Sequence, residues 1–178
     1  MADSSRWWRR NRGLPEDTYA SWASSLAAQP GRQVRILAWA GATPGYGVAS
    51  PSLLSYGDLT GWTHVGWHQI ETGGWDRDES RLSWVLYGGE RGSVELAEPG
   101  RLPEVFRERV AASIVLEKFV PILKNRGVLI SGRRDLGGSG TTITWNSTLG
   151  RGLSWQTEGV QEAADAAVAQ VRTEYDMG

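Results

Sequence analysis

Few side chains in this sequence could do chemistry, and its two histidines are the first to consider. His64 and His68 are the only histidines among 178 residues, and cysteine is absent. A spacing of four residues brings two imidazoles together on a helix. The flanking Trp62, Val65 and Trp67 instead alternate as in a strand, where four residues span about 13 Å. We therefore expect no metal site, and the missing thiol removes cysteine nucleophiles and thiolate ligands.

Other catalytic motifs are also missing from the sequence. The glycines between Gly137 and Gly140 neither follow a strand and open a helix nor precede Lys-Ser or Lys-Thr, as a phosphate-binding loop requires. No Gly-x-Ser-x-Gly nucleophile elbow is present. The carboxylates from Asp76 to Glu79 lie in a charged turn of the kind that is usually solvated. We expect a non-enzymatic protein without a cofactor, with an undetected pair of catalytic carboxylates as an alternative.

A group of arginines forms the candidate ligand site. They lie on a predicted helix and hairpin, and they are Arg107, Arg109, Arg126, Arg133 and Arg134. Guanidinium groups bind phosphates and carboxylates through paired hydrogen bonds. If the ends of these elements converge, the arginines would bind an anion or an acidic peptide. The alternative is a set of structural ion pairs with Glu104, Glu108 and Asp135.

The N-terminal segment, residues 1–31, differs in composition from the remainder. It carries a basic aromatic run formed by Trp7, Trp8, Arg9, Arg10 and Arg12. Indole favours the membrane interface and arginine favours anionic head groups, so this run is a candidate membrane or partner anchor, although one such segment gives only weak, reversible attachment. The alternative is a tail whose short helix, near residues 17–28, packs Trp22 and Leu26 on the main domain.

Charge and hydropathy narrow the class of protein. A formal net charge of −1 argues against a general nucleic-acid binder, because affinity for phosphate depends on clustered lysine and arginine. No run approaches eighteen apolar residues, and the N-terminus lacks the apolar core of a secretion signal. We therefore expect a cytoplasmic protein, with the tail as a peripheral contact at the inner face of the membrane in the anchor hypothesis.

From Arg32 onward, short alternating runs separated by glycine and proline predict an antiparallel sheet. We expect five strands, near residues 34–39, 46–56, 62–75, 82–86 and 93–96. Pro51 would interrupt the second strand, and Gly73-Gly74 would kink the third. An edge such as Tyr46–Tyr56 would offer a place for a second copy of the chain to pair.

Two amphipathic helices and a hairpin complete the pattern. A helix over residues 102–116 is followed by a hairpin of residues 127–134 and 141–147, and a last helix covers residues 158–175. Residues 114–120 are β-branched enough to form a strand, so their state stays open. We expect an α+β fold of about seven strands in a curled barrel or sandwich. The C-terminal helix would cap it, and a further helix would lie between strands five and six.

Tryptophan gives a further alternative for function. Four tryptophans alternate with aliphatic neighbours and are predicted core residues: Trp39, Trp67, Trp84 and Trp145. Three others lie near turns: Trp62, Trp75 and Trp155. If these three were exposed together they would stack on sugar rings, as in a carbohydrate-binding β module.

Several segments resemble small uncharacterised actinobacterial proteins with a pleckstrin-homology-like (PH-like) fold. The resemblance spans residues 32–178, and it rests on Leu37–Ala40, Gly47–Ser50, Leu53-Leu54, Trp62–Val65, and above all on "EPGRLPEVFRERVAASIV" followed by "SGRRDL". It implies a curled seven-stranded sheet capped by a helix, usually a platform for lipid, peptide or protein, and it assigns no catalytic residues.

We therefore expect residues 32–178 to form a PH-like binding module for a protein, peptide or anionic ligand. The alternatives are a membrane-surface adaptor acting through the N-terminal tail and the carbohydrate-binding module.

Overall fold

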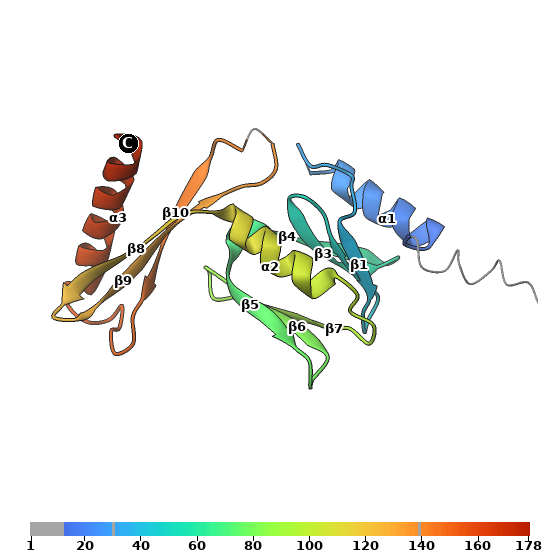
Figure 1. Ribbon diagram of the computed structural model, residues 1–178, viewed down its shortest axis with the longest axis horizontal. Helices are drawn as coiled ribbons and strands as arrows, with labels where there is room; N and C mark the ends of the chain where they lie inside the picture. The colour runs from blue at the N-terminus through green and yellow to red at the C-terminus, as the bar shows by residue number, and fades with distance from the viewer. Residues whose placement is uncertain (1–12, 30, 139) are drawn as a thin grey trace, which may run out of the picture.

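A four-stranded antiparallel sheet begins the fold in the computed structural model, which describes residues 13–29, 31–138 and 140–178. Its strands lie in chain order (Figure 1) and are β1 (Ala38–Gly41), β2 (Tyr46–Ala49), β3 (Leu53–Asp58) and β4 (Gly61–Gly66). Pro51 lies in the turn between β2 and β3, where its missing amide proton removes no hydrogen bond between strands. Residues 46–56 are thus two paired strands rather than one interrupted strand.

A short 3₁₀ helix, η1 (Trp67–Gln69), separates this sheet from a second antiparallel sheet. The second sheet has the order β5-β6-β7 and consists of β5 (Ile70–Asp76), β6 (Arg81–Leu86) and β7 (Arg91–Glu95). The side-chain oxygen of Gln69 accepts a hydrogen bond from the Gly66 amide at 2.7 Å, which stabilises the turn out of β4. The prediction of one strand over 62–75 is therefore wrong, because the chain turns at η1 and not at Gly73-Gly74.

The helix α2 (Leu102–Ser113) follows β7 and packs against elements of both sheets (Figure 1). Its apolar stripe lies in the main core, and the buried residues of that stripe are Leu102, Val105 and Phe106. The Phe106 ring meets the ring of Trp67 edge to face, with centroids 5.9 Å apart, and lies beside Trp84 at 6.4 Å. These aromatic contacts hold the helix between the two sheets.

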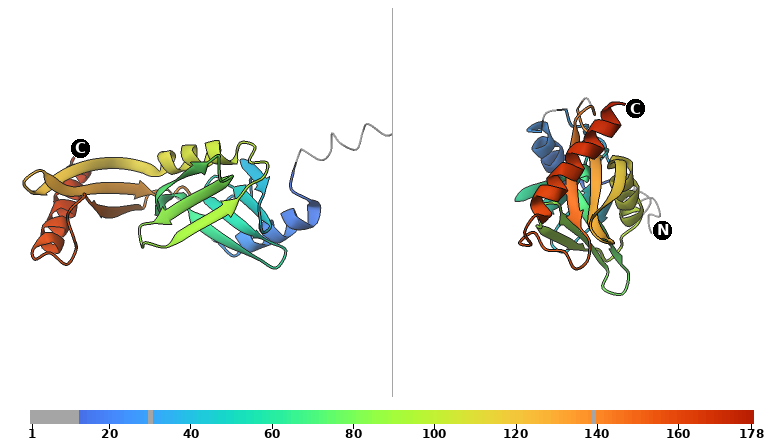
Figure 2. Two further views of the ribbon diagram at one scale, coloured as in Figure 1. Left: turned by 90° about the horizontal axis from the view of Figure 1, so that it is seen from below. Right: turned by 90° about the vertical axis from the view of Figure 1, so that its left-hand side faces the viewer.

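A third antiparallel sheet, with the order β10-β9-β8, extends from one end of the first two sheets as an arm (Figure 2). Its strands are β8 (Ile114–Leu123), β9 (Arg126–Arg134) and β10 (Ile143–Leu149). The helix α3 (Val160–Asp176) contacts all three strands and covers one face of this sheet. Val128 and Ile130 of β9 pack on Ala164, Ala167 and Val171 of α3 in a separate core, where the small alanines allow close approach.

The third sheet shows that the predicted position of the C-terminal helix, as the cap of a single barrel, is wrong. The C-terminal helix α3 packs on the third sheet, whereas α2 covers the first seven strands. The chain runs through seven strands before α2, because the predicted strands 46–56 and 62–75 are each two strands. The helix predicted between the strand at 93–96 and the hairpin at 127–134 is present as α2. The α+β class and the antiparallel sheets are confirmed, but the three sheets do not form one closed barrel. Residues 114–120, left open by the sequence, are strand.

The helix α1 (Glu16–Ala27) packs on the outer face of the first sheet (Figure 1). Trp22 and Leu26 are buried there against Val48 and Leu53, as the spacing of apolar residues predicts. The indole nitrogen of Trp62 donates a hydrogen bond to the Ser21 hydroxyl at 3.1 Å. The apolar and polar contacts together fix the helix on β3 and β4.

The predicted aromatic platform is not assembled. Trp62 and Trp75 contribute to different hydrophobic clusters, and Trp155, which is 43% exposed, lies between β10 and α3. Of the predicted core tryptophans, Trp67 and Trp84 are buried, whereas Trp39 and Trp145 are half-buried. The described tryptophans therefore give no support to a flat surface for sugar rings.

Candidate peptide-binding grooves

Arg133, the most central of the predicted anion-site residues, is a structural residue. It is 2% exposed, and its guanidinium donates to the Tyr87 hydroxyl at 3.0 Å, the Ser113 hydroxyl at 3.0 Å and the Val110 carbonyl at 3.1 Å. A further bond joins it to the Ser131 hydroxyl at 3.2 Å. All four acceptors belong to the protein and are neutral, so Arg133 connects β9 to α2 and to the turn after β6.

The other four predicted arginines do not gather around Arg133. Arg126 lies seven residues away at the opposite end of β9, which corresponds to about 23 Å of strand. Arg109 donates to the carbonyl of Pro51 at 2.8 Å. Arg107 and Arg134 are exposed, on α2 and at the end of β9 respectively. The structure therefore does not bring these five residues together, and anion binding by any of them stays a prediction.

The expected ion-pair partner of these arginines, Asp135, binds a different residue. Arg32 donates to both carboxylate oxygens of Asp135, at 2.6 and 3.0 Å, and the Gly137 amide donates to one of them at 2.9 Å. Burial raises the pKa of Asp135, but these hydrogen bonds outweigh it and hold the pKa below its ordinary value. The pair ties the segment before β1 to the loop after β9.

The predicted tail anchor, formed by Trp7, Trp8, Arg9, Arg10 and Arg12, lies outside the described residues.

His64 lies between two serine hydroxyls. Ser25 donates to the Trp22 carbonyl at 2.6 Å, so its oxygen accepts from the Nε2–H of His64 at 3.0 Å. Nδ1 then accepts from the Ser55 hydroxyl at 2.8 Å. Burial lowers the pKa of His64, which favours this neutral form. Because neither partner is a carboxylate, the arrangement lacks the orienting acid of a catalytic triad, and it joins α1 to the first sheet.

His68 lies in η1 rather than on a strand, with its Nδ1 3.6 Å from a carboxylate oxygen of Asp135. Burial lowers the pKa of His68, while the charge of Asp135 raises it. Within the part of the chain that the structure describes, no three histidine, aspartate or glutamate side chains gather in a way that could hold a metal ion.

A groove between β5 and α2 is the first candidate ligand site. This β5 groove has a volume of about 350 Å³ and is lined by Gly73, Gly74, Trp75, Pro103, Glu104, Phe106 and Arg107. The strand β5 is at the edge of its sheet, and Thr72, Gly73 and Gly74 are consecutively exposed. Two glycines in a strand are typical of sites where another backbone approaches closely.

The alternation of hydrogen bonds along β6 shows which backbone N–H and C=O groups of β5 are not bonded to β6. Leu86 donates to the Glu90 carbonyl, so even-numbered residues of β6 bond to β7 and odd-numbered ones bond to β5. Gly74 is paired with Ser83 and Gly73 with Trp84. Gly73 and, two residues on, Trp75 therefore direct their backbone N–H and C=O groups away from β6, to the free edge of the sheet.

The β5 groove combines an apolar floor with a charged rim. Phe106 is buried beneath Gly73, where a Cβ atom would lie 2.7 Å from the Phe106 ring. Trp75 is half-buried at the other end. On the rim, Glu104 pairs with Arg101, while Arg107 has no ion pair with another described residue. The groove thus offers backbone bonds, an apolar surface and an unpaired positive charge.

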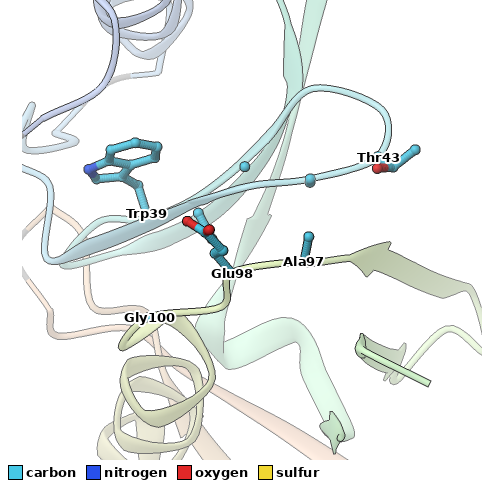
Figure 3. Close-up of a pocket in the computed structure, with 8 residues that line it drawn as sticks. Trp39, Thr43, Ala97, Glu98 and Gly100 are labelled. Carbon is cyan, nitrogen blue, oxygen red and sulfur yellow. The ribbon is translucent and has the colours of Figure 1, made fainter. Parts of the chain in front are cut away.

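A second groove lies between the free edge of β1 and the segment that links β7 to α2 (Figure 3). This β1 groove has a volume of about 800 Å³ and is lined by Trp39, Ala40, Gly41, Ala42, Thr43, Ala97, Glu98 and Gly100. At one end, the Thr43 amide donates to the Glu95 carbonyl at 3.0 Å. Among the described residues, no other backbone hydrogen bond joins β1 to the segment between β7 and α2.

The sequence does not predict either groove, because each groove depends on which strands form the edges of the sheets. The signal in the sequence is Gly73-Gly74, which lies on an exposed edge strand and does not form the predicted kink. The edge proposed for a second copy, Tyr46–Tyr56, is instead interior, since β2 and β3 each have a neighbour on both sides.

None of the described helices has the length and apolar character needed to cross a membrane. Comparison with protein-family models, with curated proteins and with solved structures yields no match to this chain.

Proposed function

We propose that the protein is a non-enzymatic, PH-like binding module that takes an extended peptide into the β5 groove. The peptide adds to β5 as a further antiparallel strand, and its backbone pairs with Gly73 and Trp75. Main-chain hydrogen bonds supply affinity in this mode of recognition, and pockets for alternate side chains supply specificity.

The observation that carries this proposal is the exposed run Thr72–Gly74 on an edge strand beside a helix. Natural proteins usually protect such an edge with bulky charges, proline or a covering loop. Here two glycines leave the backbone open, and a Cβ at Gly74 would meet no atom within 4 Å. An edge left open in this way favours strand addition.

The side chains around the groove indicate the kind of peptide. An apolar residue of the peptide would lie on the floor formed by Trp75 and Phe106, and an acidic residue would meet Arg107. We therefore propose a ligand with an apolar anchor followed or preceded by a carboxylate.

The order of elements supports the PH-like part of the proposal. Four antiparallel strands are followed by three more, and then by a helix that packs on both sheets. The resemblance implies seven strands and a capping helix, although the expected strands included the hairpin of residues 127–134 and 141–147 and the expected cap was the C-terminal helix. We propose instead that β1 to β7 and α2 make up the PH-like unit. The third sheet and α3 are additions to that arrangement.

Amide hydrogen exchange tests the proposal directly. A peptide is selected from a random twelve-residue display library against the full chain, and exchange is followed by NMR. In the free protein, the amides of Thr72 and Gly74 are bonded to β6 and exchange slowly, whereas those of Gly73 and Trp75 exchange quickly. Binding should slow Gly73 and Trp75 and leave the other two unchanged.

Two variants test whether the selected peptide binds in the β5 groove or on another surface. Arg107→Glu should weaken the selected acidic peptide about five-fold, the scale of one exposed ion pair. Arg77→Glu, in the exposed turn after β5, is the matched charge reversal and should have no effect. If no selected peptide slows Gly73 and Trp75, or if both variants weaken binding equally, the proposal fails.

A further inference from the structure

The β1 groove presents free backbone groups on its sheet side. Ala42 donates to the Gly45 carbonyl at 2.8 Å, which fixes the phase of the β1–β2 ladder. Even-numbered residues of β1 bond to β2, and odd-numbered residues face the free edge. Thr43 agrees with this phase, because its amide donates outward to Glu95. Trp39 and Gly41 therefore direct their N–H and C=O groups into the β1 groove.

The opposite wall also has free backbone groups. Leu96 donates to the Ser80 carbonyl, and Leu102 donates to the Pro99 carbonyl. Between these bonds, the amides of Ala97 and Glu98 have no backbone acceptor among the described residues. Both residues are exposed. Two polar walls with unpaired groups can hydrogen-bond an extended chain placed between them.

The charge of the β1 groove differs from that of the β5 groove. Glu98 is the one charged residue among the eight that line it. Figure 3 shows Glu98 and Trp39 toward the same end of the groove, away from Thr43. A carboxylate attracts a cation, and an indole face adds a cation–π interaction when the cation lies within about 6 Å of the ring. The remaining lining residues are small and leave room for a long side chain.

We propose that the β1 groove binds an extended segment of a partner protein that carries arginine or lysine. The segment pairs its backbone with Trp39 and Gly41, and its cationic side chain lies between Glu98 and the Trp39 indole. The charge of the groove selects this occupant over an acidic or neutral one. The site goes beyond the proposed function, since it lies on a different sheet edge and prefers the opposite charge.

Retention of peptides by the immobilised full chain tests the site. The probes are nonapeptide pools whose central residue is fixed as Arg, Lys, Gln or Glu. The Arg and Lys pools should be retained over the Gln and Glu pools, and the preference should fall as salt is raised from about 0.05 to about 0.5 M. Equal retention of all four pools would overturn the proposal.

Two variants locate the preference. Glu98→Gln should reduce the advantage of the Arg pool about five-fold, whereas Glu90→Gln, in the exposed turn between β6 and β7, should leave it unchanged. Gly41→Pro removes an outward N–H without removing a bond to β2, and a Cβ there meets no atom within 4 Å. It should lower retention of every pool at this site while the protein still melts cooperatively. Full retention in both Glu98→Gln and Gly41→Pro would overturn the proposal.

A last variant distinguishes a partner from the chain itself. Four arginines lie in residues 1–12, namely Arg6, Arg9, Arg10 and Arg12. Replacing all four by glutamine should leave retention of the Arg pool unchanged. A marked increase would show that this segment competes for the groove, and it would overturn assignment of the site to a partner.

Discussion

Replacing the buried Arg133 should loosen the attachment of the arm to the first seven strands. Arg133→Ala removes hydrogen bonds to the Tyr87 hydroxyl, the Ser113 hydroxyl and the Val110 carbonyl, and it empties space at a residue that is 2% exposed. Hydrogen bonds from a charged donor contribute about 1.5–3 kcal/mol each, and those of one side chain do not add fully. We expect a loss of about 4 kcal/mol in the free energy of unfolding.

For a chain of this length, each kcal/mol corresponds to about 2–4 °C in Tm, so Arg133→Ala should melt about 8–16 °C lower. Thermal melting followed by circular dichroism measures the shift. Arg133→Lys keeps the charge, but a single ammonium cannot reach both Tyr87 and Val110, so its loss should be intermediate. Arg134→Ala, at the exposed neighbouring position, should change stability by less than about 0.5 kcal/mol. An Arg133→Ala protein that melts within about 2 °C of the wild type would refute the reasoning.

Two further predictions concern the first two sheets. Burial lowers the pKa of His64 and of His68, so the unfolded chain binds more protons than the folded chain just below pH 6.5. The free energy of unfolding should therefore fall between about pH 7 and pH 5, and urea titrations of His64→Gln should show a shallower fall; an identical slope would contradict the assigned cause. A Cβ at Gly92 would overlap the Trp84 ring, so Gly92→Ala should cost about 1–3 kcal/mol and alter tryptophan fluorescence. Gly61→Ala, with no atom within 4 Å of its Cβ, is the control, and equal losses in the two variants would argue against overpacking at Trp84.

Local sequence patterns predicted where the helices lie better than they predicted which sheet each helix packs on. The 3.6-residue periodicity of residues 17–28, 102–116 and 158–175 corresponds to α1, α2 and α3. Periodicity shows that a helix has an apolar face, but it does not show which sheet covers that face. Both α2 and α3 have such a face, and α3, which is expected to cap one barrel of seven strands, packs on the third sheet, while α2 packs on the first two sheets. The alanines of α3 were a signal for close packing and not for a particular sheet.

The turn at η1 shows a second limit of predicting strands from the alternation of apolar residues. Val65 and Trp67 are both buried in the main core, as alternation along one strand predicts. The hydrogen bond from the Gly66 amide to the Gln69 side chain stabilises the turn at η1. After this turn Ile70 is buried and Gln69 is exposed, whereas continued alternation from Val65 and Trp67 would place Gln69 inward. Alternation therefore gave the correct inward face only as far as Trp67, and it gave the wrong strand boundary. Sheet edges, and with them both grooves, follow from such boundaries and from long-range pairing.

The continuity of α2 with β8 links the arm to the β5 groove. The helix ends at Ser113 and the strand begins at Ile114, so no flexible connection separates the groove wall from the third sheet. Arg133 bonds to Val110 and Ser113 in the last turn of that helix, and to Tyr87 beyond β6. A planar guanidinium with several directed donors fixes the angle between these elements, which an apolar side chain of similar volume would not do. We infer that this buried charge serves to orient the arm relative to α2, the helix that lines the groove.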